Sequence, residues 1–142
     1  MKQLLAAPRF AQIILGGAGG LYLLSGFALL FAPNWFFHTL GYFPPFNRHY
    51  AGDLGAFLLP LGVGLLWTIP EPSRQVRLIW TVAIASFLHA GNHIYDALLV
   101  SSPPIGVWAF QVGPLLLLAV LLTLVALVYT IAPSDQASHQ DP

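Results

Sequence analysis

Two short polar clusters interrupt an otherwise apolar sequence, and their side chains are of the types that bind metal ions and transfer protons. One cluster contains His49 and Asp53, and the other contains His89, His93 and Asp96. Residues three or four apart lie on the same face of an α-helix. Each cluster therefore presents imidazole and carboxylate groups together on one face of its own helix.

These imidazoles and carboxylates form a ligand set suited to one divalent cation. Zn(II), Fe(II) and Mn(II) are the ions that such nitrogen and oxygen ligands favour. The sequence has no cysteine and a single methionine, Met1, which disfavours copper(I). The His-x3-His spacing occurs in helical metalloprotease motifs, but their general-base glutamate is missing here. One hypothesis is a single-ion site whose ligands are His49, Asp53, His89, His93 and Asp96.

A second hypothesis assigns the same residues to a small ligand or to proton transfer. A histidine beside an aspartate titrates close to physiological pH, and Arg48 would hold an acidic group. The edge of this pocket would contain Arg48, Gln111, Asn92 and Tyr95. No serine–histidine–aspartate spacing indicates nucleophilic catalysis, so the sequence leaves open whether the protein is an enzyme.

A third hypothesis is structural. Arg48 would pair with Asp53 or Asp96, the histidines would hydrogen-bond to the carboxylates, and this network would join two helices at their ends. Ionisable residues inside a membrane are functional by default, but they also serve as ties between helices. The residue types and their spacing do not separate the three hypotheses.

The elements that carry both clusters are predicted to be membrane-spanning helices. The chain has 142 residues, of which 57% are hydrophobic and 7% charged, whereas soluble domains have about 25% charged residues. Zero net charge excludes a basic nucleic-acid surface. Crossing a bilayer takes about 20 helical residues, and lipid offers the backbone no hydrogen-bond partners. Four stretches are long enough: about 10–32, 50–69, 77–100 and 106–132.

The predicted fold is therefore all-α, a four-helix transmembrane bundle with a short interfacial segment between the first two helices. That segment, Asn34–Phe43, is aromatic and flanked by prolines, so it forms either a short helix or a folded lid that carries His38. Residues 1–132 form one membrane domain, and the polar residues 133–142 form a disordered tail.

Small residues and prolines predict how the helices pack. Gly16 and Gly20 have the small-xxx-small spacing that lets helix backbones approach closely. The glycines of the second helix are expected to do the same: Gly52, Gly55, Gly62 and Gly64. Pro60 and Pro114 are expected to bend the second and fourth helices. The Pro60 bend would then form the floor of a cavity below Asp53.

Basic residues predict the orientation in the membrane. Lys2, Arg9, Arg74 and Arg77 lie on one side and only Arg48 on the other, so the positive-inside rule places both termini in the cytoplasm. The second helix then begins at the outer side and the third helix ends there. Both polar clusters are therefore expected at the same depth, in a pocket that faces the periplasm.

Three sequence patterns carry a family resemblance. They are Phe-Ala-Pro-Asn-Trp-Phe-Phe-His-Thr-Leu-Gly after the first helix, Asn-Arg-His-Tyr-x-x-Asp-x-Gly at the start of the second, and His-x3-His-x2-Asp at the end of the third. In these patterns the chain resembles small four-helix bacterial membrane proteins of the DoxX-like and related uncharacterised groups. The resemblance implies the bundle fold and a multi-pass location in the bacterial inner membrane, and it implies no activity.

Two functions are predicted from these observations. The first is binding of a metal ion or a small ligand at the periplasm-facing pocket. The alternative is a non-catalytic structural or assembly subunit of a membrane complex. The expected partners are the lipid bilayer and either another membrane protein or a second copy of the chain.

Overall fold

The computed structural model of the chain describes residues 8–41, 44–99 and 105–131. Within these ranges every element is helical, which confirms the all-α prediction. In chain order the elements are α2 (Pro8–Phe31), α3 (Pro33–Thr39), α4 (Arg48–Thr68), the 3₁₀ segment η1 (Pro72–Gln75), α5 (Val76–Leu99), the π-helical segment η2 (Val107–Val112) and α6 (Gly113–Ile131). Residues 101–104, between the predicted third and fourth helices, and the predicted tail at 133–142 lie outside the described residues.

The long helices begin and end close to their predicted bounds, at residues that explain why they do. Asn47 precedes α4, and its side-chain oxygen accepts hydrogen bonds from the backbone N–H groups of His49 and Tyr50, at 2.9 and 3.4 Å. This is a regular N-cap. Pro70 follows the end of α4. The predicted short element after the first helix is α3, which begins with Pro33 in its first turn.

Three helices in the described part of the chain are long and apolar enough to cross a membrane: Arg9–Phe31, Arg48–Thr68 and Val107–Ile131. They indicate that the protein associates with a membrane. α5 is as long as α2, 24 residues. It is less apolar because its C-terminal half contains His89, Asn92, His93 and Asp96.

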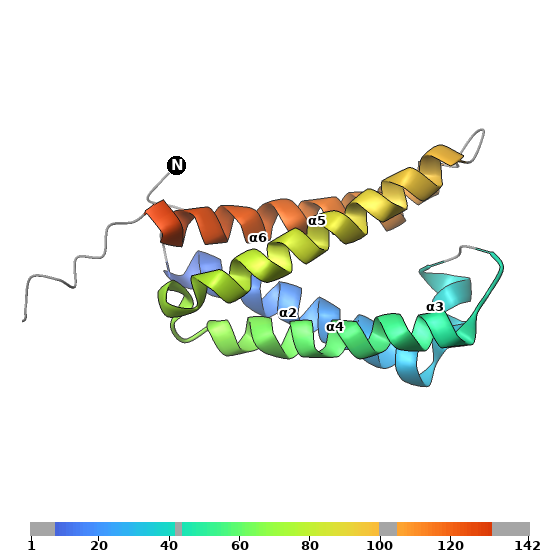
Figure 1. Cartoon of the computed structure of the whole chain (residues 1–142), viewed down its shortest axis with the longest axis horizontal. Coiled ribbons are helices and arrows are strands. Elements are labelled where there is room, and N and C mark those ends of the chain that lie inside the picture. Colours follow the sequence, from blue (N-terminus) through green and yellow to red (C-terminus); the bar gives the residue numbers. More distant parts are fainter. Residues whose placement is uncertain (1–7, 42–43, 100–104, 132–142) are drawn as a thin grey trace, which may run out of the picture.

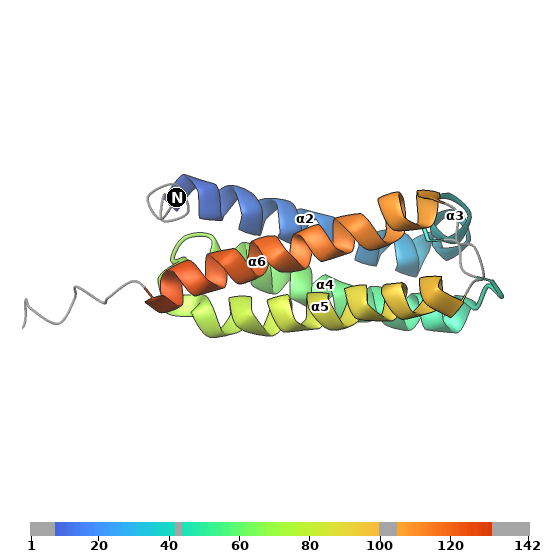
Figure 2. The ribbon, with the colours of Figure 1, turned by 90° about the horizontal axis from the view of Figure 1, so that it is seen from above.

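Four long helices run side by side along the molecule as two pairs, with α3 at one end (Figures 1 and 2). α2 packs closely along α4, and α5 packs closely along α6. At the end where α2 starts and η1 lies, here called the η1 end, the two pairs meet. At the opposite end, here called the α3 end, α5 diverges from α4 (Figure 1).

Glycines bring α2 and α4 into close contact. A Cβ atom added at Gly62 would lie 2.9 Å from the carbonyl oxygen of Gly19, and one added at Gly55 would lie 2.8 Å from that of Gly26. Both distances are well below van der Waals contact with backbone atoms that have little freedom to move. These two helices therefore approach each other only because all four positions are glycine.

Gly55 and Gly62 on the second helix pack closely, as expected, whereas Gly16 and Gly20 do not form this contact. A Cβ atom at Gly20 would meet no described atom within 4 Å, and one at Gly16 would be in ordinary contact with Ile69, at 3.6 Å. The contact runs instead through Gly19 and Gly26, two helical turns apart. Each successive residue turns by about 100°, so a shift by one position from Gly20 to Gly19 reaches a different face.

The two pairs share a packed core only toward the η1 end. Its fully buried side chains include Leu15, Leu65, Ile79 and Leu122. A hydrogen bond from the indole of Trp80 to Thr130, at 3.0 Å, joins α5 to α6 at the same end. Because the core does not continue between the pairs at the α3 end, a space remains there.

Candidate functional site

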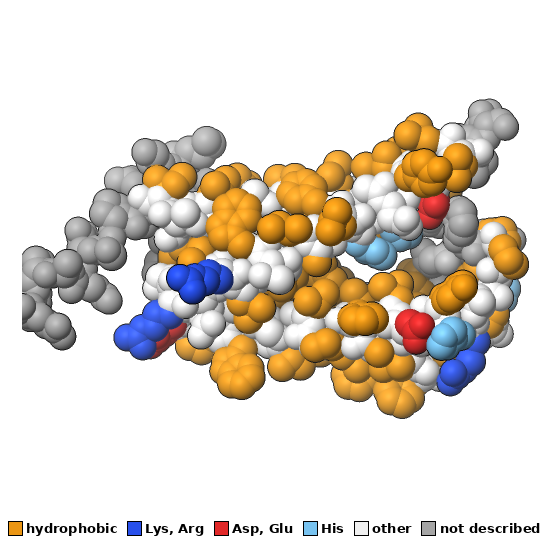
Figure 3. All heavy atoms as spheres, viewed as in Figure 1, with side chains coloured by type: hydrophobic (Ala, Val, Ile, Leu, Met, Phe, Trp, Pro, Cys, Tyr) orange, Lys and Arg blue, Asp and Glu red, His pale blue; other side chains and the backbone are white. Residues whose placement is uncertain are grey.

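A cavity of about 610 Å³ lies between the two helix pairs at the α3 end. Figure 3 shows a hollow on the side of the molecule between α4 and α5, with histidine side chains beside it. Pockets for small ligands have volumes of about 300–1,000 Å³. The cavity is thus large enough for a small organic molecule.

Most of the cavity wall is apolar. α2, α4 and α6 contribute leucines, while α3, η2 and the segment before α4 contribute phenylalanines. The apolar lining includes Leu21, Leu29, Phe36, Phe37, Phe46, Leu54, Leu58, Phe110, Leu115 and Leu118. Phe37 also contacts Phe46, with ring centroids 5.1 Å apart, so α3 and the segment before α4 form one continuous aromatic wall.

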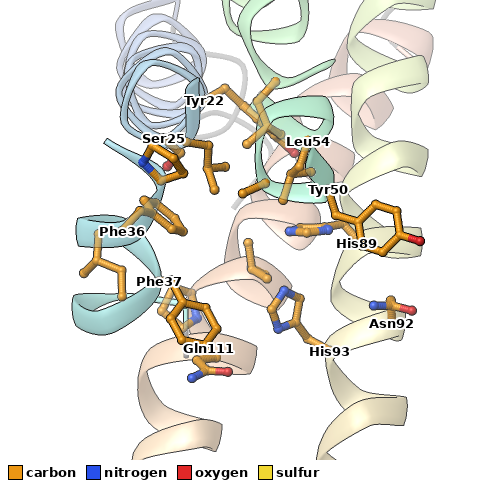
Figure 4. Close-up of a pocket in the computed structure, with 18 of the residues that line it drawn as sticks. Tyr22, Ser25, Phe36, Phe37, Tyr50, Leu54, His89, Asn92, His93 and Gln111 are labelled. Carbon is orange, nitrogen blue, oxygen red and sulfur yellow. The ribbon is translucent and has the colours of Figure 1, made fainter. Parts of the chain in front are cut away.

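The polar part of the lining is small, and α5 contributes more of it than any other helix. His89, Asn92 and His93 line the cavity, with Gln111 from η2. In Figure 4 the rings of His89 and His93 point from α5 into the space between the helices, and Phe36 and Phe37 lie across that space. Tyr22, Ser25, Asn47 and Tyr50 complete the polar lining.

The two cavity histidines contact each other edge to face. Their ring centroids are 4.8 Å apart and their planes are inclined by 82°. Neither imidazole has a hydrogen-bond partner among the described residues. No buried side-chain nitrogen or oxygen in these residues lacks a partner, so the unpaired imidazole nitrogens are not buried. The imidazole nitrogens are therefore reachable from the cavity and free to bind a ligand.

A buried pair of hydroxyl groups lies at the floor of the cavity. The Tyr22 and Ser86 oxygens are 2.6 Å apart, and the Ser86 hydroxyl donates to the backbone carbonyl of Val82, also at 2.6 Å. Serine has one hydroxyl proton, so Tyr22 must donate its proton to Ser86. This bond joins α2 to α5 where the core ends and the cavity begins.

Sequence reasoning missed this pair, although signals for it exist. Tyr22 and Ser25 are polar interruptions of the first apolar stretch, three residues apart and so on one face. Ser86 precedes His89 by the same interval. Both helices thus carry a polar stripe toward the α3 end, and a search for matching stripes would have found it.

The η2 segment widens the helix that carries Gln111. The backbone N–H of Gly113 donates to the carbonyl of Trp108, five residues earlier, as in a π-helix. Pro114 has no N–H group, so the carbonyl of Phe110 cannot receive the usual α-helical bond. Single π-helical turns often occur at functional sites. The irregularity expected at Pro114 is therefore this π-helical turn, and it lies in the cavity wall.

Of the five predicted ligands, only His89 and His93 line the cavity. His49 and Asp53 contact each other at 3.5 Å, with 79% and 57% of their side chains exposed. Asp96 accepts a hydrogen bond from the Asn92 amide, at 3.2 Å. The interactions of these predicted residues thus each stay within one helix.

The reason lies in the rotation of α4. Tyr50 and Leu54 face the cavity, and each is one residue after His49 and Asp53. One residue corresponds to about 100° of rotation. When Tyr50 and Leu54 face inward, His49 and Asp53 are turned away from α5 and toward the surface.

Other predicted features also lie elsewhere. Arg48 and Tyr95 are exposed, and Arg48 forms no ion pair with Asp53 or Asp96 in the described ranges. The predicted tie between helices is therefore not formed by these groups. His38 is exposed on α3 and contacts the ring of Phe37. Pro60 is exposed on α4 and does not line the cavity, so the prediction that its bend forms the floor is wrong.

The described residues contain no group of three or more histidine, aspartate or glutamate side chains placed to hold a metal ion. The predicted ligand set is divided: His89 and His93 line the cavity, while His49 and Asp53 are exposed on α4. Asp96 is half-buried on α5 and does not line the cavity. A site for one divalent ion stays a prediction from the sequence, and the geometry favours the small-ligand hypothesis.

Comparison with known proteins finds no matching family model, no matching curated protein and no matching solved structure. The DoxX-like resemblance therefore stays a prediction from the three sequence patterns.

Proposed function

We propose that the chain is a four-span membrane protein that binds a small amphiphilic molecule in the cavity at its α3 end. One observation carries the proposal: an apolar cavity of about 610 Å³ into which two imidazoles with reachable nitrogens point. Pockets of this type bind the apolar body of a ligand by burial and fix its orientation with a few polar groups.

Four membrane crossings are supported by the surface of α5. Ile84, Phe87 and Leu88 are exposed on this helix, as expected for side chains in contact with lipid. Its two histidines face the cavity instead. Polar residues inside a membrane are tolerated when they face an interior cavity. With α5 included, the chain crosses the bilayer four times and both described ends lie on one side.

The orientation follows from the arginines. Arg9, Arg74 and Arg77 are exposed toward the η1 end, and Arg48 lies at the start of α4, at the α3 end. The positive-inside rule then places the η1 end in the cytoplasm. In the bacterial inner membrane, which the DoxX-like resemblance implies, the cavity faces the periplasmic half of the bilayer.

The test is native mass spectrometry of detergent-purified protein, which detects small molecules that remain bound. His89→Phe/His93→Phe keeps a planar aromatic ring at each position and removes the ring nitrogens. We expect bound ligand in the wild type and a loss of about tenfold in this variant, since each lost hydrogen bond contributes about 0.5–1.5 kcal/mol.

The matched control is His49→Ala/Asp53→Ala, which removes a histidine and an aspartate from outside the cavity. It is expected to retain the ligand. Equal amounts of ligand in all three proteins, or none in the wild type, would refute binding in the cavity.

A further inference from the structure

We infer that the ligand is an uncharged single-chain amphiphile with a hydroxyl-bearing head, which reaches the cavity sideways from the bilayer between α4 and α5. The inference rests on the proposed function and names the class of molecule bound. Three features support it: the charge of the lining, the distribution of hydrogen-bond donors and acceptors, and the position of the opening.

No lysine, arginine, aspartate or glutamate is among the described residues that line the cavity. The nearby charged residues are outside the lining: Arg48 and Asp53 are exposed on α4, and the Asp96 carboxylate on α5 accepts a hydrogen bond from the Asn92 amide. A charged group in an apolar environment is costly unless an opposite charge pairs with it. A phosphate, carboxylate or ammonium head would meet no opposite formal charge here, whereas an uncharged head would need none.

The polar groups of the cavity are complementary to a hydroxyl group. Tyr22 donates its proton to Ser86, so its oxygen offers only lone pairs to the cavity. A neutral imidazole has one N–H donor and one acceptor nitrogen. Neither His89 nor His93 has a hydrogen-bond partner in the described part of the protein. A hydroxyl both donates and accepts, so it satisfies Tyr22 and an imidazole at once.

The remaining surface of the cavity suits a hydrocarbon chain. Leucines from three helices and phenylalanines from α3 and η2 form it, and burial of each CH₂ group is favourable by about 0.8 kcal/mol relative to water. A lipid-soluble molecule gains less from burial, because the bilayer is also apolar. Its selection then depends mainly on the polar head, which is why the head group decides specificity.

The opening of the cavity is on the side of the molecule. Figure 3 shows the hollow between α4 and α5, with hydrophobic side chains over much of this face and acidic and histidine side chains near the hollow. Tyr50 lines the cavity and is also 70% exposed, so it stands at this opening. In a protein that spans the bilayer, this side faces lipid, and a ligand crosses no aqueous phase to reach the histidines.

Three amphiphiles with the same oleoyl chain and different head charges test the proposed head group. They are 1-monooleoylglycerol, which is neutral, oleate, which is anionic, and oleylamine, which is cationic. Each is titrated into detergent-purified full-length protein, and bound molecules are counted by native mass spectrometry. We expect 1-monooleoylglycerol to bind at least about ten times more tightly than either charged analogue, because the charged heads lose hydration without gaining a partner.

The same titration is repeated with His89→Phe/His93→Phe and with the control His49→Ala/Asp53→Ala. The first is expected to weaken binding of 1-monooleoylglycerol about tenfold, and the control to leave it unchanged. If oleate or oleylamine binds as tightly as the neutral analogue, the inference is overturned. If that binding still depends on the two cavity histidines, the proposed function stands. Failure of all three to bind would also overturn the inference. The amounts of co-purified ligand in the wild type and the two variants would then test the proposed function separately.

Sideways access is tested by thiol labelling, for which this cysteine-free chain gives no background. Ser25→Cys places a thiol in the cavity, and Asn34→Cys places one on the exposed surface of α3. In liposomes, the cavity thiol is expected to react at least about ten times faster with a lipid-soluble maleimide than with a charged one, relative to the surface thiol. Equal relative rates would overturn access from the bilayer.

Discussion

The two ends of the molecule are built from the same four long helices and differ in how completely they are filled. At the η1 end, leucine, isoleucine and valine side chains from all four helices pack into one apolar core. At the α3 end, the pairs separate around a cavity lined by histidines, amides and phenylalanines. The hydrogen bond between Tyr22 and Ser86 marks the boundary. The comparison teaches that close packing of the four helices is confined to one end, and that the other end leaves the space in which we propose that a ligand binds.

The largest expected effect is a difference in stability between matched leucine truncations on α4. Leu65 is fully buried at the η1 end, and Leu54 lines the cavity. Leu65→Ala is expected to lower the free energy of unfolding by about 2–5 kcal/mol, because it leaves a void in a packed core. Leu54→Ala enlarges an existing space and should lower the free energy of unfolding by less than about 1.5 kcal/mol. This is below the transfer free energy of a fully buried leucine, because Leu54 is only half-buried.

Unfolding of both variants in mixed micelles of detergent and sodium dodecyl sulfate, followed by circular dichroism, measures this difference. Equal losses would mean that the α3 end is packed as tightly as the η1 end. The proposed cavity would then be wrong.

A smaller effect is expected at the boundary between the two ends. Tyr22→Phe and Ser86→Ala each remove the hydrogen bond between α2 and α5, and each should lower the free energy of unfolding by about 0.5–1.5 kcal/mol. In the double variant the losses should not add, because both changes remove the same bond. Additive losses in this double-mutant cycle would show that the two hydroxyls do not interact.

The smallest effect is expected for the exposed histidine and aspartate on α4. His49→Ala/Asp53→Ala should change the free energy of unfolding by less than about 0.5 kcal/mol, since exposed ion pairs contribute little. Elemental analysis of the wild type, of this variant and of His89→Phe/His93→Phe provides a second measurement. If the geometry is correct, none contains a stoichiometric metal ion; one ion per chain that both variants lose would restore the predicted five-ligand site.

These two histidine clusters also show how far the site could be predicted. The spacing of His89 and His93 correctly placed both rings on one face, because helical periodicity is a local property. The same rule placed His49 and Asp53 on one face of α4, and their contact at 3.5 Å agrees. Which face of α4 turns toward α5 is not local. It depends on the close packing of Gly55 and Gly62 against α2, which orients the whole helix.

The sequence by itself determined that the chain is helical, approximately where its long helices begin and end, that a short interfacial segment follows the first, and that polar groups gather on α5. Composition, capping residues and prolines act over a few residues, and they are sufficient for these features. Only the tertiary structure decided which glycines meet, that Tyr22 bonds to Ser86 across 64 positions of sequence separation, and that His89 and His93 face a cavity while His49 and Asp53 face outward. These features depend on how helices rotate against each other, and that rotation is set by the fit of many side chains from distant parts of the chain.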